Sequence, residues 1–151
     1  MNKVYVLGAV TGGADNAKEL FGVYKKQLGC FDEFNEGGSF EENIYGTPLE
    51  TMKFKGTDEE RFARAKKAVS NAHLIVADAS TVSFGAGIEL GIAHMLKKRI
   101  VVFAQKGLKV SALIKGMIGE NNVIYYTDKN DLARKIRDNQ TINDAAAEIR
   151  Y

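Results

Sequence analysis

Two uninterrupted apolar runs constrain the fold of this chain more than any other feature of its sequence. Residues 74–77 and 100–103 carry only hydrophobic side chains. Strands of this kind are covered on both faces, which is typical of parallel sheets. Elsewhere the hydrophobic pattern takes the helical period, as in residues 14–28, where the apolar side chains fall on one stripe.

Strand and helix patterns alternate along the chain. We expect strands at residues 3–8, 74–77, 100–103 and 123–126, and helices at residues 14–28, 57–71, 85–98, 110–117 and 128–150, the last broken near Thr141. This alternation indicates a parallel sheet with helices on both faces. The sequence therefore predicts an α/β fold, a Rossmann-like (flavodoxin-like) doubly wound sheet of about five strands. At 151 residues, we expect one domain over residues 1–151.

The least regular segment is residues 35–57, which hold four glycines and the single proline of the chain. We expect a long loop there, and loops of this length are usually functional or disordered. At its end, Thr57 and Glu60 have the spacing of a capping box, which predicts the start of a helix.

Composition excludes several classes of protein. The net charge of +2 is too small and too evenly spread for nucleic acid polymers to be the main partner. No apolar run reaches the roughly 18 residues that span a membrane. The N-terminus enters a strand pattern without a signal-peptide layout, so a cytoplasmic protein is expected. The single Cys30 is expected in the core, and no metal or other cofactor is expected, because no ligand-spaced cluster of acids or histidines occurs.

The most informative stretch runs from residue 77 to residue 91, where a strand ends and a helix opens. Its glycines follow the spacing Gly-x-Gly-x-x-x-Gly, one residue longer than the dinucleotide fingerprint, and the next strand does not end on an acid. A nicotinamide cofactor is therefore not expected. The Ser83 hydroxyl, the accessible amides at Gly85 and Gly87, and the helix N-terminus instead favour a phosphate or a carboxylate.

Two carboxylates in this stretch have open interpretations. Glu89 lies about one turn inside the helix, flanked by Ile88 and Leu90. It is either a surface or capping acid, or a carboxylate held ionised at a ligand pocket as nucleophile or base. Asp78 ends a strand and either caps the following turn or acts in the site. A receiver-domain phosphoacceptor is disfavoured, because residues 9–13 carry no acid for Mg²⁺.

These residues resemble the nucleoside 2-deoxyribosyltransferase-like family, and within it the 2′-deoxynucleoside 5′-phosphate N-hydrolases. The resemblance runs over most of residues 3–126. It is carried by three motifs, which are Tyr5-Val6-Leu7-Gly8 followed by Gly12-Gly13, then Ser83-x-Gly85-x-Gly87-x-Glu89-Leu90-Gly91, and finally Ser111-Ala112-Leu113-Ile114-Lys115-Gly116.

The resemblance implies an enzyme that cleaves the N-glycosidic bond of a (deoxy)nucleoside or its 5′-monophosphate, by hydrolysis or by base transfer. Glu89 would attack the anomeric carbon, since a carboxylate traps an oxocarbenium-like transition state, and Tyr5 would help to position the glutamate or the sugar. Ser83 at its position implies a phosphate-bearing substrate. Ser111 would serve a neighbouring subunit's phosphate site in a homodimer or larger assembly. The implied substrate and phosphate contacts further include Gly8, Gly12, Gly13, Gly85 and Gly87.

The sequence departs from the family at the second catalytic acid. An ungapped count from Glu89 puts Ala65 where the family carries an aspartate that helps to protonate the leaving base. Asp78, Glu42 or Glu50 would then have to substitute. Two hypotheses follow, an N-glycosidic enzyme and a non-catalytic nucleotide sensor or regulatory module on the same fold.

Overall fold

The computed structural model describes residues 3–8, 14–31, 33–36, 56–80 and 84–148. Its centre is a five-stranded sheet in the order β2-β1-β3-β4-β5, with every neighbouring pair parallel. The strands are β1 (Lys3–Gly8), β2 (Glu33–Glu36), β3 (Leu74–Asp78), β4 (Arg99–Gln105) and β5 (Val123–Tyr126). The predicted doubly wound parallel sheet is confirmed.

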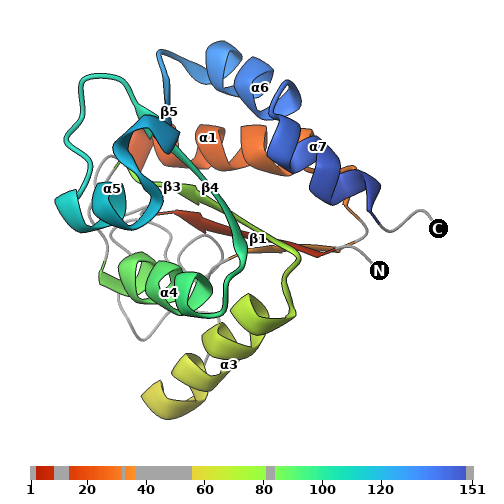
Figure 1. The fold of residues 1–151 in the computed structure, drawn as a ribbon, viewed down its shortest axis with the longest axis vertical. Helices are drawn as coiled ribbons and strands as arrows, with labels where there is room; N and C mark the ends of the chain where they lie inside the picture. Colours follow the sequence, from red (N-terminus) through yellow and green to blue (C-terminus); the bar gives the residue numbers. More distant parts are fainter. Residues whose placement is uncertain (1–2, 9–13, 32, 37–55, 81–83, 149–151) are drawn as a thin grey trace.

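Helices cover both faces of this sheet (Figure 1). One face carries α1 (Ala14–Gln27), α6 (Lys129–Arg137) and α7 (Gln140–Ala147), and the other carries α3 (Asp58–Asn71), α4 (Phe84–Met95) and α5 (Ala112–Ile118). A 3-10 turn at Glu120–Asn122 leads into β5. Each face has its own hydrophobic cluster, one containing Tyr24 and Phe103 and the other containing Ile75 and Leu90.

The strand order places a topological switch point between β1 and β3. The chain moves from β1 to β2 on one side of β1, and later to β3 on its other side. Ligands of such sheets bind beyond the carboxyl ends of the strands at this point. Gly8 and Asp78, which are paired in the sheet, mark it in this protein.

Local signals in the sequence explain where several helices begin and end. The capping box at α3 is formed as predicted: the Thr57 hydroxyl accepts from the Glu60 amide at 3.2 Å, and the Glu60 carboxylate accepts from the Thr57 amide at 2.7 Å. The C-terminal helix breaks slightly earlier than expected, because the Asn139 side chain accepts from the Ile142 amide at 3.0 Å and so starts α7.

Three expectations need correction. No strand was expected between residues 8 and 74, but β2 pairs with β1 and includes the first residues of the expected loop. Residues 37–55 lie outside the described residues. Cys30 is exposed and does not belong to the core, since it lies in the turn after α1. The helix expected to reach Lys98 ends at Met95, and Lys97 takes a left-handed φ of 54° in the following turn.

Among the described residues, no helix combines the length and the hydrophobicity that a membrane span needs.

Candidate active site

The central contact of the site joins β1 to α4. Tyr5 is almost completely buried, and its hydroxyl donates a hydrogen bond to Oε1 of Glu89 at 3.1 Å. Tyr5 belongs to the hydrophobic cluster on the α3–α4–α5 face, so its ring leaves the sheet on that side. A phenol from the strand next to the switch point therefore holds a carboxylate on the helix above it.

Glu89 lies at the edge of the buried face of α4. Leu90 and Ala93 of the same helix are buried against the sheet, while Glu89 is half-buried. Burial raises the pKa of the Glu89 carboxyl, and the hydrogen bond from Tyr5 partly offsets this by lowering it. Of its two carboxylate oxygens, only Oε1 takes a hydrogen bond from the residues that the structure describes. The arrangement leaves Oε2 available to a ligand.

Asp78 lies on the opposite face of the sheet from Glu89. Its Oδ2 accepts hydrogen bonds from the Tyr24 hydroxyl at 2.7 Å and the Tyr126 hydroxyl at 2.9 Å, and its Oδ1 accepts from the Ser80 amide at 3.0 Å. Both tyrosines belong to the hydrophobic cluster under α1 and α6. Burial, first of all, raises the pKa of Tyr24 and of Tyr126, and the negative charge of Asp78 raises both further. The structure thus brings Tyr5 and Glu89 together and separates Asp78 from them.

The first turn of α4 carries the two glycines of the predicted anion site. It contains Gly85 and Gly87 and has no acidic residue, so its positive dipole end is not neutralised from within the helix. A Cβ added at Gly87 would meet no atom within 4 Å, so the backbone there is open to a ligand. Gly12, Gly13 and Ser83 lie outside the described residues.

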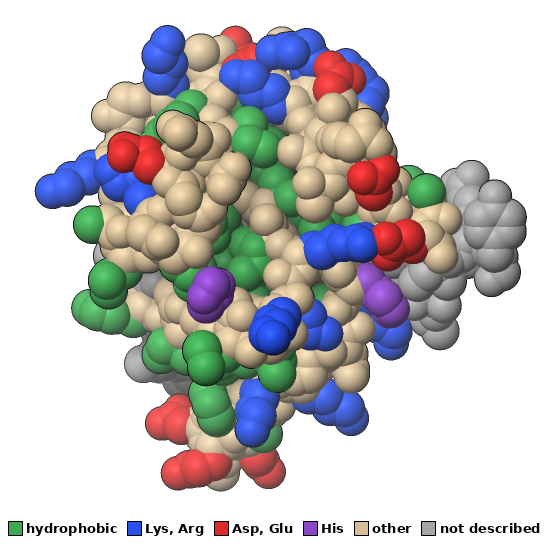
Figure 2. Space-filling model, in the orientation of Figure 1, with side chains coloured by type: hydrophobic (Ala, Val, Ile, Leu, Met, Phe, Trp, Pro, Cys, Tyr) green, Lys and Arg blue, Asp and Glu red, His purple; other side chains and the backbone are tan. Residues whose placement is uncertain are grey.

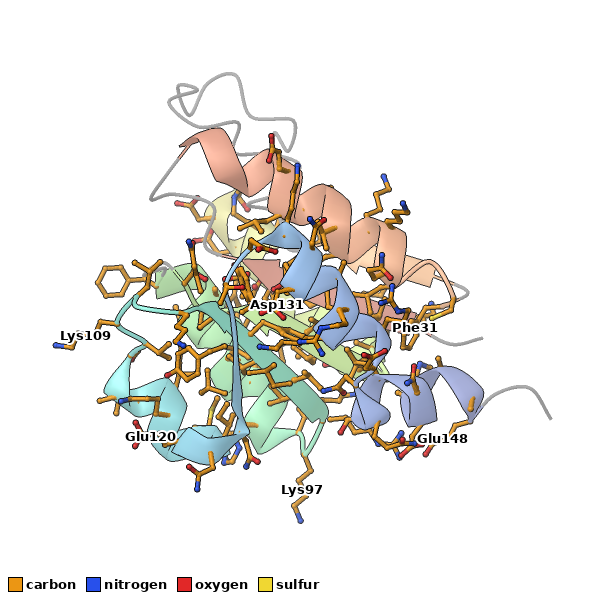
Figure 3. All side chains as sticks on the ribbon, turned by 90° about the horizontal axis from the view of Figure 1, so that it is seen from above. Phe31, Lys97, Lys109, Glu120, Asp131 and Glu148 are labelled. Atoms are coloured by element: carbon orange, nitrogen blue, oxygen red, sulfur yellow. The ribbon has the colours of Figure 1, made fainter. Side chains whose placement is uncertain are left out.

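A cavity of about 490 Å³ lies between α4 and α5, and its walls are mainly apolar. Asp78, Gly87 and Ser111 are among its lining residues. Lys109 lines it too, and Figure 3 shows its labelled side chain pointing away from the protein. Glu89 is not among its lining residues. At about 100° per residue, Glu89 and Gly87 project to different sides of α4, so this cavity and the Tyr5–Glu89 contact are separate places.

The helix expected to carry a second acid does not provide one near Glu89. Ala65 is half-buried, one turn before the buried Val69 and on the same face of α3. The acidic residues of α3 are confined to its first turn and are exposed: Asp58, Glu59 and Glu60. The predicted substitutes Glu42 and Glu50 lie outside the described residues. Within the described part of the chain, no group of three or more acids, histidines or cysteines is placed to hold a metal ion.

The sequence pattern did not identify Tyr24 and Tyr126 as partners of Asp78. A phenol hydroxyl in an otherwise apolar stripe is the signal that pointed to them, because a buried hydroxyl needs a hydrogen-bond partner.

Comparison with known proteins finds similarity in structure only. No family model matches the sequence, and no curated protein matches it. The CMP N-glycosidase BcmB of Clostridium botulinum superposes with a TM-score of 0.60 at 18% identity, over 89% of this chain and 98% of its own. A 2-deoxyribosyltransferase of Leishmania mexicana superposes with a TM-score of 0.59 at 14% identity, over 91% of this chain and 99% of its own. A 2-deoxyribosyltransferase of Bacillus psychrosaccharolyticus superposes with a TM-score of 0.53 at 15% identity, over 87% of this chain and 90% of its own. The chain shares the fold of these proteins over nearly its whole length.

Proposed function

We propose that this chain is an enzyme of the nucleoside 2-deoxyribosyltransferase-like family, and that it cleaves the N-glycosidic bond of a nucleoside or a nucleoside 5′-monophosphate. The observation that carries the proposal is the half-buried Glu89 carboxylate, held by the Tyr5 hydroxyl beside the switch point of the sheet. The shared fold with an N-glycosidase and two deoxyribosyltransferases supports it. A carboxylate on an otherwise apolar stretch of helix costs stability, which is expected where the residue serves a reaction.

In the proposed reaction, Glu89 is the nucleophile. Its Oε2 forms a bond to C1′ of the sugar while the bond from C1′ to the base nitrogen breaks, and the electron pair leaves with the base, which takes a proton from solvent. Water then attacks C1′: its hydroxyl stays on the sugar, its proton goes to solvent, and the Glu89 carboxylate is released. A second base in place of water gives transfer. The Tyr5 hydrogen bond holds Glu89 in the orientation for attack and favours the ionised form.

The first turn of α4 favours a substrate with a 5′-phosphate. Gly85 and Gly87 of this turn are both exposed, and the turn carries no acid, which suits an anion. Ser83 precedes this helix directly and would add a hydroxyl. Gly8, at the end of β1, together with Gly12 and Gly13, would allow the sugar or the phosphate to approach the backbone.

A second candidate function is nucleotide binding without turnover. It is favoured by the position of Ala65 on α3, where the resemblance expects an acid, and by Asp78, whose carboxylate is occupied by two tyrosines. General acid catalysis contributes about 10²–10⁴-fold, so its loss would leave a slow enzyme or a sensor.

Chromatography of released base separates the two candidates. Purified protein is incubated with a panel of nucleoside 5′-monophosphates and the matching nucleosides, together with Glu89→Gln and the control Glu59→Gln, which removes an exposed acid on α3. We expect base release by the wild type and by Glu59→Gln but not by Glu89→Gln. Ligand-dependent thermal stabilisation without release, with the nucleotide recovered intact, would support the sensor instead. Release that survives Glu89→Gln would exclude Glu89 as the nucleophile.

We further propose that the protein self-associates through α4 and α5. Phe84 and Leu113 are 88% and 85% exposed, and with Ile88 and Met95 they form an apolar face. Figure 2 shows hydrophobic side chains gathered over this part of the surface. Apolar patches of more than a few hundred Å² usually mark interaction sites, and Ser111 beside this face would then approach a neighbouring subunit.

Sedimentation velocity of wild type and Leu113→Glu tests this. A charge at the centre of a symmetric apolar contact is repeated on both subunits, so we expect the variant to be monomeric where the wild type is a dimer or larger. The control Phe62→Glu adds the same charge at an exposed apolar residue of α3. A monomeric wild type would refute the proposal.

A further inference from the structure

The carboxyl edge of the sheet contains a partly buried polar network that the proposed reaction does not use. Asp78 receives three hydrogen bonds, from Tyr24, Tyr126 and the Ser80 amide. Tyr24 and Tyr126 are each about 1% exposed. The network joins α1, β3 and β5 through one carboxylate, at distances between 2.7 and 3.0 Å.

Ser80 extends this network to β4. Its Oγ accepts a hydrogen bond from the Gln105 amide at 2.8 Å and lies 3.3 Å from the Tyr126 hydroxyl. Just before it, the Ala79 amide donates to the carbonyl of Phe103 at 2.8 Å, so the chain continues along β4 beyond the end of β3. Ser80 is therefore fixed through both its amide and its hydroxyl.

The position of Ser80 decides where the chain leaves the sheet. Only residues 81–83 separate it from Phe84, the first residue of α4. The first turn of α4 carries the amides of the anion site, and Glu89 follows on the second turn. The four Cα–Cα steps from Ser80 to Phe84 span at most about 15 Å, so the anchoring of Ser80 limits where α4 can begin.

The same geometry argues against proton transfer from Asp78 to a leaving base. Val76 and Asp78 share one face of β3, whereas Ala77 faces the cluster that contains Tyr5. The Asp78 oxygen that faces the tyrosines accepts two hydrogen bonds, and the other accepts the Ser80 amide. A carboxylate held in this way is suited to hold structure rather than to deliver a proton.

We propose that Asp78 is a positioning residue, which through Ser80 sets the start of α4 and thereby the affinity of the site for the substrate's 5′-phosphate. The inference rests on the proposed function. In this assignment neither the tyrosines nor Asp78 contacts the reacting atoms. Misplacing the first turn of α4 weakens phosphate binding, while Glu89 remains held by Tyr5 from the other face of the sheet.

The test compares kcat and KM for one nucleoside 5′-monophosphate and its parent nucleoside in wild type, Asp78→Asn and Tyr126→Phe. For Asp78→Asn we expect KM for the monophosphate to rise about ten- to a hundredfold, with KM for the nucleoside changed less than about threefold. Tyr126→Phe, which keeps the carboxylate, should shift KM in the same direction by less. The matched control is Asp138→Asn, an exposed acid after α6.

Three outcomes would overturn the proposal. A fall in kcat of about 10²–10⁴-fold for both substrates, with a changed pH profile, would make Asp78 a proton donor. A lower melting temperature with kcat and KM unchanged would make the network purely structural. An equal rise in KM for both substrates would exclude a role specific to phosphate.

If the wild type releases no base, the proposed reaction is refuted. The positioning role of Asp78 can then still be tested by measuring ligand binding. Thermal stabilisation by the same monophosphate and by the parent nucleoside is then measured in wild type and Asp78→Asn. We expect Asp78→Asn to lose most of the stabilisation by the monophosphate. Equal stabilisation of both proteins, including none in either, would overturn the inference.

Discussion

Removing the Tyr24 hydroxyl is expected to destabilise the protein by about 2 kcal/mol. Tyr24 is 1% exposed, and its hydroxyl donates to Asp78 at 2.7 Å. Tyr24→Phe keeps the ring, including its edge contact with Phe103 at a centroid distance of 6.0 Å, and removes only the hydrogen bond. Hydrogen bonds to charged groups contribute about 1.5–3 kcal/mol, and Asp78 retains its bonds from Tyr126 and Ser80.

Thermal and urea denaturation at pH 7 measure this change. For a chain of this size, about 2 kcal/mol corresponds to a melting temperature lower by roughly 4–8 °C. The control is Tyr125→Phe on the neighbouring position of β5, whose hydroxyl has no hydrogen bond to a described residue. We expect that variant to stay within about 0.5 kcal/mol of wild type.

The stability difference between wild type and Tyr24→Phe should also depend on pH in the alkaline range. Burial, reinforced by the charge of Asp78, raises the pKa of Tyr24 well above its usual value of about 10. Above pH 10 the unfolded chain loses the Tyr24 proton while the folded chain keeps it, so the stability that Tyr24 contributes is complete below pH 10 and is lost as pH rises toward the folded pKa. The difference in free energy of unfolding between wild type and Tyr24→Phe should therefore become smaller above pH 10. Equal stability of the two proteins at pH 7, or a gap that widens at high pH, would refute this reasoning.

Three further predictions concern β1 and α3. Tyr5→Phe removes the hydrogen bond that lowers the pKa of Glu89, so the acidic limb of the pH profile for base release should move to higher pH; an unchanged limb would mean that Glu89 is not the titrating group. Ala65→Asp restores an acid on the face of α3 that carries Val69, and kcat should rise toward the 10²–10⁴-fold that general acid catalysis supplies, unless protonation of the base does not limit the rate. Thr57→Ala breaks the capping box and should cost about 1 kcal/mol in thermal denaturation, whereas Thr57→Ser should remain near wild type.

The main elements of the fold could be predicted because their signals are local. The apolar run at residues 74–77 identifies a strand covered on both faces, and the structure buries all four residues. Thr57 and Glu60 identify the start of α3 through contacts only three residues apart. By contrast, β2 has the sequence Glu-Phe-Asn-Glu and lies at the edge of the described sheet, where it pairs with β1. A strand defined by its neighbour has little signal in its own residues.

The candidate site was only partly predictable for the same reason. The position of Glu89 after a glycine-rich helix start is a local pattern, and the motif led directly to it. The partners of Asp78 lie 54 and 48 residues away in sequence, so nothing near Asp78 indicates that its oxygens are occupied. The Tyr5–Glu89 contact spans 84 residues and entered the prediction only through the family resemblance.

The different surroundings of Asp78 and Glu89 follow from the two-residue period of a strand. Successive side chains of β3 point to opposite faces, so Ala77 and Ala79 face α4, while Asp78 faces α1 and α6. An acid one position earlier or later would have faced the same side as Tyr5. Asp78 instead accepts hydrogen bonds from two phenols, whereas Glu89 has a single donor among the described residues and keeps one oxygen open. A carboxylate that reacts must retain an unoccupied oxygen, and of these two only Glu89 does so among the described contacts.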